Sequence, residues 1–327
     1  MPDIAPKFPP PAKARVTSKA DPGQLPAHGL KVSPAAQAQA PQLADTMSPD
    51  RALRLIVASC LDHILPNAAV VAAGAGAPEH LHQARVGLRR LRTALKVFGH
   101  WSGDVQPEWE AQARALFARL GATRDSDVMV ATLLPQLQAA GAPAGLVLEM
   151  ADTGSINDDS AAALREAAIG TLWAQLTCFA HGEPVDPAAG SHLTLSTLAL
   201  PVVERLQRRL LDDASNFALL DDVQRHSTRK RIKRLRYTLE FIGSLFRRKA
   251  LRRCLDRLQP VQTALGDYND LVVAEAACRA WADRDTRAWF AVGWCAARRA
   301  EALSHATAAL AAYKPEDGLA RRPSQAD

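Results

Sequence analysis

Basic side chains recur at helical spacing along one short stretch of this sequence. Between residues 82 and 96 (HQARVGLRRLRTALK), five basic or potentially basic residues are separated by steps of three and four, with no acid in the stretch: His82, Arg85, Arg89, Arg92 and Lys96. This spacing places them along one side of an α-helix. An Arg guanidinium can bond two phosphate oxygens at once, and a Lys ammonium acts as a mobile point charge. The pattern predicts a surface, called here the first basic face, that binds a phosphate-rich polyanion.

The helix that carries this face also has an apolar stripe, about 100° away around its axis. Its members recur at steps of four and three: Ala84, Leu88, Leu91, Leu95 and Phe98. The stripe predicts that one side of the helix packs into a core. For the basic side of the same helix, the alternative to a binding surface is that its charges are simply exposed to solvent. Surface helices usually interleave acids with bases, however, because neighbouring like charges destabilise a helix by about 0.2–0.5 kcal/mol per pair.

The basic stretch occurs twice. Residues 226–243 (HSTRKRIKRLRYTLEFIG) align with residues 82–99 (HQARVGLRRLRTALKVFG) at an offset of 144. A second match, LGATRD at 120–125 with LGDYND at 265–270, has an offset of 145. We interpret this as an internal duplication, whose two basic faces can meet across a pseudo-twofold axis. Glu240 stands where the first copy has Lys96, which weakens the far end of the second copy. The second basic face consists of His226, Arg229, Lys230, Lys233 and Arg236.

The run H-x-x-R-x-x-[LI]-[RK]-R-L-R, followed in each half by L-G-x-x-[RN]-D, resembles the conserved histidine α-helical domain (CHAD) family. The resemblance covers about residues 50 to 312. It implies an all-α fold, in which two pseudo-symmetric helical bundles form one compact domain with a basic central groove. It also implies inorganic polyphosphate as the ligand, bound without known chemistry, and a cytoplasmic location associated with polyphosphate granules. Other polyanions are possible partners.

Further residues extend the candidate site. Arg124 could reach the groove from its motif position, although Asn269 replaces it in the second copy. Lys249 and Arg253 lie in the basic run 247–257 and are predicted to extend the basic surface, with a solvated face as the alternative. Asp125 and Asp270 each follow a glycine and precede an apolar run. They are therefore predicted to be helix N-caps.

His82 and His226 head the two basic faces and are predicted to donate hydrogen bonds to phosphate. Binding should then strengthen as the pH falls through the imidazole range. A satisfied structural histidine and a metal ligand are the alternatives. A metal site would need convergent ligands, for which only Asp125, Asp127 and Asp270 are candidates. No metal and no cofactor is predicted.

Composition predicts closely packed helices and an uneven charge distribution. Of the 327 residues 48% are hydrophobic but only 5% aromatic, which is typical of Ala- and Leu-rich helical proteins. The net charge is +6, yet residues 82–96, 225–236 and 247–257 together carry +17, which leaves −11 for the rest. Such segregation favours a polyanionic partner. Five scattered cysteines are expected to be reduced core residues of a cytosolic protein: Cys60, Cys178, Cys254, Cys278 and Cys295.

The chain divides into three parts by composition. Residues 1–47 contain nine of the 21 prolines and are predicted to be a disordered tail. Residues 48–312 form the helical domain, with halves at about 48–182 and 191–312, and residues 313–327 are expected to fray. Neither a secretory signal nor a membrane span is expected, because Asp62, His63 and Pro66 interrupt the most apolar stretch. Helices are predicted at 49–65, 78–99, 108–120, from 125, 158–180, 196–213, 219–246, 249–264, 268–283 and 285–311.

Three other function classes remain open at this stage. A protein that binds RNA or single-stranded DNA would place aromatic residues among the basic ones, and Tyr237 is the only one away from an apolar stripe. A metal-dependent phosphohydrolase is less favoured, because the chain lacks G-x-x-x-x-G-K-[ST] and the alternating Glu pattern of CYTH tunnel enzymes. A scaffold that binds an anionic surface, including a membrane, is the third. We predict a binding protein and not an enzyme.

Overall fold

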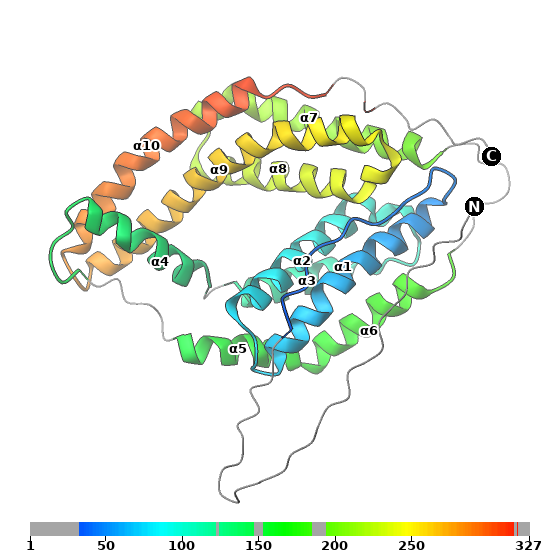
Figure 1. The fold of residues 1–327 in the computed structure, drawn as a ribbon, viewed down its shortest axis with the longest axis horizontal. Coiled ribbons are helices and arrows are strands. Elements are labelled where there is room, and N and C mark those ends of the chain that lie inside the picture. Colours follow the sequence, from blue (N-terminus) through cyan, green and yellow to red (C-terminus); the bar gives the residue numbers. More distant parts are fainter. Residues whose placement is uncertain (1–32, 122–123, 147–152, 185–193, 317–318, 320–327) are drawn as a thin grey trace, which may run out of the picture. The chain divides into compact units, whose positions relative to one another are not determined.

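The computed structural model describes residues 33–121, 124–146, 153–184, 194–316 and 319, without the side chains of 124–131 and 153–158. Within these ranges the protein is all-α, as predicted, with ten α-helices and no strand (Figure 1). The helices are α1 Pro49–Ala72, α2 Pro78–Phe98, α3 Glu108–Arg119, α4 Arg124–Ala139, α5 Thr153–Arg165, α6 Ala167–His181, α7 Leu195–Asn216, α8 Asp222–Ile242, α9 Arg248–Ala282 and α10 Ala288–Ala312. Short 3-10 turns are η1 Gly99–Trp101, η2 Phe217–Leu219 and η3 Gly243–Leu245.

Helix α1 is the centre of the first group of helices, where it packs against α2, α5 and α6. Ser48 caps it by accepting a hydrogen bond from the Arg51 amide at 3.3 Å, and Pro49 occupies the first turn. The predicted stop at Pro66 is wrong, because the helix continues to Ala72 with Pro66 exposed inside it. By length and composition α1 could cross a membrane, but half of its most apolar window is buried inside the protein, as in a core helix.

The second group comprises α7, α8, α9 and α10. Asp221 and Gln224 form a reciprocal capping box at the start of α8, which fixes where this helix begins. Helix α9 is a single helix of 35 residues that runs through Gly266, where two helices were predicted. Asp270 therefore lies inside a helix, and its predicted role as an N-cap is wrong.

Helix α4 packs against the second group, although it lies in the first half of the chain (Figure 1). Its Leu133 and Leu137 join a small apolar cluster with Cys278 of α9 and with Val292 and Cys295 of α10. The seam between halves, predicted near residues 181–190, falls largely outside the described residues. This packing of α4 nevertheless means that the two halves of the sequence do not form two separate groups of helices.

Local similarity supports the alignment of the two halves only in part. Both α2 and α8 end at a glycine that begins a 3-10 turn, Gly99 and Gly243. The similarity is lost further on, because α3 ends before Gly121 whereas α9 continues through the matching Gly266. The predicted single helix over residues 158–180 is also two helices, which meet at the extended backbone of Glu166. The pseudo-symmetric arrangement as a whole stays a prediction.

Residues 34–47, called here the N-terminal segment, lie along the helices. The disordered tail was predicted to extend to residue 47, and this part of that prediction is wrong. Leu43 is buried in the main core, and its amide and carbonyl both hydrogen-bond the Ser244 hydroxyl. The Ala36 backbone bonds twice to the Asn67 side chain on α1. Asp45 accepts hydrogen bonds from the first two residues of α7. Residues 1–32 lie outside the described residues.

The chain beyond α10 is fastened in a similar way. Tyr313 and Leu319 are buried. The Glu316 carboxylate contacts Arg253 at 2.6 Å and Arg257 at 3.1 Å on α9. Fraying from residue 313 onward is therefore not observed in the part of this tail that is described. Four of the five cysteines are buried as predicted, whereas Cys178 is exposed, and all five are free thiols.

Candidate functional site

The first basic face lies on α2, about 100° around the helix axis from its apolar stripe. That stripe is buried as predicted, with Ala84, Leu88, Leu91 and Phe98 at 0% exposure. On the basic face Arg85 is buried, His82, Arg89 and Arg92 are half-buried, and Lys96 is exposed. A purely solvated row of cations would not show this gradient. The cations are held against neighbouring structure, so the question becomes what holds them.

Phe117 of α3 is the aromatic surface against which three of these cations pack. The guanidinium carbons of Arg85 and Arg89 each lie 5.2 Å from the centre of its ring, and that of Arg92 lies 5.7 Å away. A cation over an aromatic face is stabilised by about 0.5–1 kcal/mol when exposed and by more when desolvated. Arg85 also approaches Gly121 so closely that a Cβ there would lie 3.1 Å from its Nη2. The glycine of the first L-G motif therefore makes room for Arg85.

Among the described side chains, Glu110 of α3 is an acid that reaches this face. Glu110 contacts the Arg92 Nε at 3.0 Å and the Lys96 Nζ at 3.1 Å. Burial alone would raise the pKa of the Glu110 carboxyl, but the hydrogen bonds from Lys96 and Arg92 outweigh it and lower that pKa. Arg89 makes no ion pair with any described residue. It is therefore a cation on this face whose neighbours leave its charge uncompensated.

The head of the second basic face is held by the second L-G motif, on α9. The Nδ1 of His226 lies 2.6 Å from the Asn269 Oδ1, and Arg229 lies 3.6 Å from a carboxylate oxygen of Asp270. Tyr268 is buried and accepts a hydrogen bond at 2.8 Å from Arg225, one residue before His226. Three consecutive residues of α9 thus contact Arg225, His226 and Arg229 in the first two turns of α8.

The rest of the second basic face is more open. Lys230 is exposed and makes no ion pair within the described structure. Lys233 is half-buried. Arg236 contacts Glu240 at 2.9 Å and donates to the side-chain oxygens of Gln259 and Gln262 on α9. The weakening predicted at this end thus has a physical cause, since the Glu240 carboxylate takes up one of the cations.

Glu240 also joins the two basic helices. Arg90 of α2, which is almost fully buried, forms an ion pair with it and lies over the ring of Phe241 at 4.7 Å. The rings of Phe98 and Phe241 meet edge to face with their centres 6.4 Å apart. Arg90 therefore pairs away from the first basic face. Its role is to fix α2 against α8, which brings the two basic faces into one part of the molecule.

A cluster of arginines lies where α2, α7 and α8 meet. Burial lowers the pKa of Arg234, and the charges of Arg209, Arg231 and Arg92 lower it further. Arg231 is paired with Asp213. Arg92 of the first basic face is therefore within electrostatic reach of Arg234 on α8. A group of like charges on a partly exposed surface favours an anion at this place.

The remaining predicted residues lie differently. Lys249 is exposed near the start of α9. Arg253 is paired with Glu316, so its charge is already taken up by the C-terminal residues. Arg124 begins α4, and its side chain lies outside the described residues. No group of three His, Cys, Asp or Glu side chains that could hold a metal occurs among the side chains described, which do not include those of Asp125 and Asp127.

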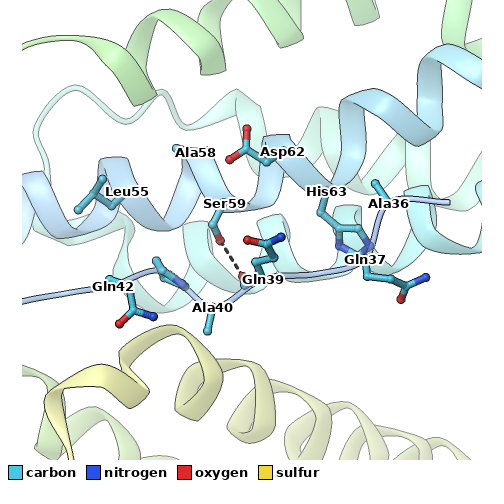
Figure 2. Close-up of a pocket in the computed structure, with 11 residues that line it drawn as sticks. Ala36, Gln37, Gln39, Ala40, Gln42, Leu55, Ala58, Ser59, Asp62 and His63 are labelled. Atoms are coloured by element: carbon cyan, nitrogen blue, oxygen red, sulfur yellow. Dashed lines mark hydrogen bonds between the residues drawn. The ribbon is translucent and has the colours of Figure 1, made fainter. Parts of the chain in front are cut away.

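Two cavities of the described structure lie away from both basic faces. One, of about 480 Å³, lies between the N-terminal segment and α1. Figure 2 shows Gln39, Ala40 and Gln42 of that segment alongside Ser59, Asp62 and His63 of α1, with the Ser59 hydroxyl bonded to the Gln39 carbonyl. The other, of about 390 Å³, is lined by residues of α1, α3 and α6 and of the chain before α3. Neither cavity is lined by a residue of the two basic faces.

Sequence reasoning missed the partners of the basic residues. Phe117, Glu110 and Asn269 contact the basic faces from other helices, and Arg209 and Arg234 add charge beside them. Arg234 could have been found, because it lies inside the repeated run. Asn269 and Asp270 carried a signal as parts of the repeated L-G motif, but the motif glycine was interpreted as a helix stop.

The fold and the site together define an all-α protein in which two basic helices, α2 and α8, pack against each other. Comparison with family models matches residues 55–279 to the CHAD domain. The chain is similar to the crystal structure of the CHAD domain from the plant Ricinus communis, with 31% sequence identity and a TM-score of 0.70. The match covers 86% of this chain and 98% of the Ricinus communis chain. No match is found among curated proteins. The chain belongs to the CHAD family.

Proposed function

We propose that this protein binds inorganic polyphosphate without catalysing a reaction. The binding surface consists of the two basic faces together with Arg209 and Arg234. Lys249 lies near the edge of this surface, and Arg253 contributes less because Glu316 already neutralises it. The observation that carries the proposal is the packing of Arg85, Arg89 and Arg92 around Phe117. An aromatic ring orients these cations without cancelling their charge.

The arrangement fits the chemistry of a phosphate polymer. Successive turns of α2 and α8 present a cation about every 5.4 Å, and each guanidinium can bond two phosphate oxygens. A chain of phosphates can therefore occupy several donors at once without any base or sugar being recognised. Such binding releases condensed counterions, so the affinity should fall steeply with salt, by analogy with nucleic acids.

Family membership supports the same ligand. CHAD domains are associated with polyphosphate-related proteins. We propose the cytoplasm as the location, with association to polyphosphate granules. The RNA alternative gains no support from the aromatic side chains near the site. Three guanidiniums lie near the Phe117 ring and Arg90 lies near that of Tyr237, so a base that stacked on either ring would have to compete with these cations.

Competition between two polyanions tests this proposal. Labelled long-chain polyphosphate is bound to the full-length protein, and unlabelled polyphosphate or single-stranded RNA of equal phosphate content is added at about 0.15 M salt. Polyphosphate should displace the label at a concentration at least about tenfold lower than RNA, because it has one charge per smaller repeat. Displacement by RNA at an equal or lower concentration would contradict the proposal.

A second arm of the same experiment tests the absence of catalysis. Bound polyphosphate is incubated with Mg²⁺, Mn²⁺ or Zn²⁺, and released orthophosphate is measured over several hours. We expect no release above that of the protein-free control. Turnover that disappears in His82→Ala would show a phosphohydrolase instead.

A further inference from the structure

His226 is held by a single, short hydrogen bond from a neighbouring helix. Its Nδ1 lies 2.6 Å from the Asn269 Oδ1, and the Asn269 amide nitrogen points to Asp270 at 3.4 Å. The amide oxygen has no proton to give. The imidazole must therefore carry its hydrogen on Nδ1 when it is neutral. The other nitrogen, Nε2, makes no hydrogen bond with a described residue and is not enclosed.

The residues around Asn269 fix the two helices against each other at this point. Tyr268 donates to Asp222 at 2.5 Å and accepts from Arg225 at 2.8 Å, which anchors the first turn of α8 to α9. Arg225 in turn donates to the carbonyl of Ala218 at 2.8 Å. Tyr268 precedes Asn269 and Arg225 precedes His226 in the chain, and both are anchored. Asn269 therefore cannot easily follow a rotation of the imidazole ring. The ring is thus oriented from α9 and not by its own helix.

We propose that Asn269 is a positioning residue that fixes the His226 tautomer and turns Nε2 toward the bound anion. This inference takes its ligand from the proposed function, but the tautomer itself does not depend on that ligand. In the protonated ring the bond to Asn269 remains, and Nε2 becomes the donor that a phosphate oxygen accepts. The second basic face would then begin with a donor of fixed direction.

The sequence of the first copy offers no matching acceptor. Arg124 aligns with Asn269, and a guanidinium has no acceptor to offer an imidazole. The two histidines at the heads of the faces are therefore expected to differ in how they are oriented. This difference supplies an internal control, since a change at Asn269 should affect His226 and leave His82 as it was.

Nuclear magnetic resonance of ¹⁵N-histidine-labelled full-length protein tests the tautomer. Long-range ¹H–¹⁵N spectra at about pH 8, where the ring is neutral, identify the protonated nitrogen, and His226→Gln assigns the signal. We expect Nδ1–H in the wild type and in Asn269→Asp, which keeps an acceptor oxygen. Asn269→Ala should shift His226 to Nε2–H or to a mixture, without moving His82. An Nε2–H ring in the wild type, or an unchanged Nδ1–H ring in Asn269→Ala, would overturn the inference.

Calorimetric titration with polyphosphate then tests the link to binding. Asn269→Ala should weaken binding about five- to tenfold, which corresponds to losing one oriented hydrogen bond to a charged group. Alanine favours the helix at this position, so a loss of folding is not expected, and circular dichroism checks it. Unchanged or tighter binding by Asn269→Ala, in the presence of a changed His226 tautomer, would show that the tautomer does not affect binding. Absence of binding in the wild type would instead contradict the proposed function and leave the tautomer result intact.

Discussion

Phe117 shows how single residues determine the character of the first basic face. A carboxylate in its place would hold Arg85, Arg89 and Arg92 as well, but it would also neutralise one of them. The ring attracts cations through its quadrupole and takes no charge from them. It therefore lowers the cost of keeping like charges together before the ligand arrives.

Replacing Phe117 by alanine should weaken polyphosphate binding about three- to tenfold. The three guanidiniums would lose their common support and would have to be ordered on binding, which costs conformational entropy. Calorimetric titration measures the change. Phe290→Ala, in the cluster between α9 and α10, is the matched control, because it also removes a partly buried ring. Equal weakening by both variants would mean that the ring acts only through general stability.

His226 makes a prediction about pH. Burial lowers the pKa of its imidazole, the bond to Asn269 raises it in part, and the charges of Lys230, Arg229 and Lys233 lower it again. Folding thus favours the neutral ring. The stability of the ligand-free protein should therefore fall as the pH drops from the unfolded-state value of about 6.5 through the lowered folded-state value.

Polyphosphate binding should show the opposite trend, because an anion favours the protonated ring. Titrations between about pH 7.5 and pH 5.5 should show affinity rising as the pH falls, and His226→Gln should flatten the part of the rise that the ligand's own protonation does not cause. A steeper rise in His226→Gln than in the wild type would contradict this role.

At the scale of helices, the basic residues of one helix find acidic partners on neighbouring helices. Neither α2 nor α8 carries an acid through most of its basic stretch, yet Glu110 on α3 and Asp270 on α9 reach the basic faces. Each occupies donors that a phosphate would need. Under the proposed function, these acids compete with polyphosphate for those donors.

Glu110→Gln should therefore strengthen polyphosphate binding, by about three- to tenfold at low salt, because it frees Arg92 and Lys96 and removes a negative charge. Glu301→Gln, an exposed change of the same kind on α10, should alter the affinity less than twofold. Weaker binding by Glu110→Gln would show that this carboxylate positions Arg92 and does not compete with the ligand.

Much of this level could be predicted from the sequence. The periods of three and four in α2 and α8 gave the buried apolar stripe and the basic face, because both depend only on helix geometry. The breaks between helices were harder. Gly266 stays inside α9 because its Cβ position is open on all sides and a helical glycine costs only about 1 kcal/mol. Glu166 breaks a helix with no glycine or proline beside it.

The partners of the site could not be predicted, for a different reason. Asn269, Asp270, Glu110 and Phe117 act across helix pairs, and periodicity within one helix contains no information about its neighbours. The N-terminal segment escaped prediction because it is extended and proline-containing. It is held mainly by backbone hydrogen bonds, which leave no periodic pattern of side chains.

At the scale of residues 34–327, the N-terminal segment connects the two groups of helices. It bonds to Asn67 on α1, to Ser244 after α8 and to the start of α7. The Gln39 carbonyl accepts a hydrogen bond from Ser59 on α1. These contacts lie on α1, which packs against α2, and on the turn directly after α8. The segment should therefore help to hold α2 and α8 together.

Leu43→Ala should lower the free energy of unfolding by about 2–4 kcal/mol, since it leaves a cavity at a buried leucine. Thermal unfolding followed by circular dichroism measures it. Gln42→Ala changes the exposed neighbour and should stay within about 0.5 kcal/mol of the wild type. A Leu43→Ala protein as stable as Gln42→Ala would show that the segment is not part of the cooperative fold.

The central claim is that the two basic faces together hold one polyphosphate chain. The most direct test is calorimetric titration of long-chain polyphosphate into the wild type, an Arg89→Glu/Lys233→Glu variant and an Arg51→Glu/Arg284→Glu variant. Both variants change the net charge equally, but Arg51 and Arg284 are exposed residues outside the two faces. We expect the first variant to bind at least about a hundredfold more weakly and the second to remain within about threefold of the wild type. Equal affinity of Arg89→Glu/Lys233→Glu and the wild type, or equal losses in both variants, would contradict the account.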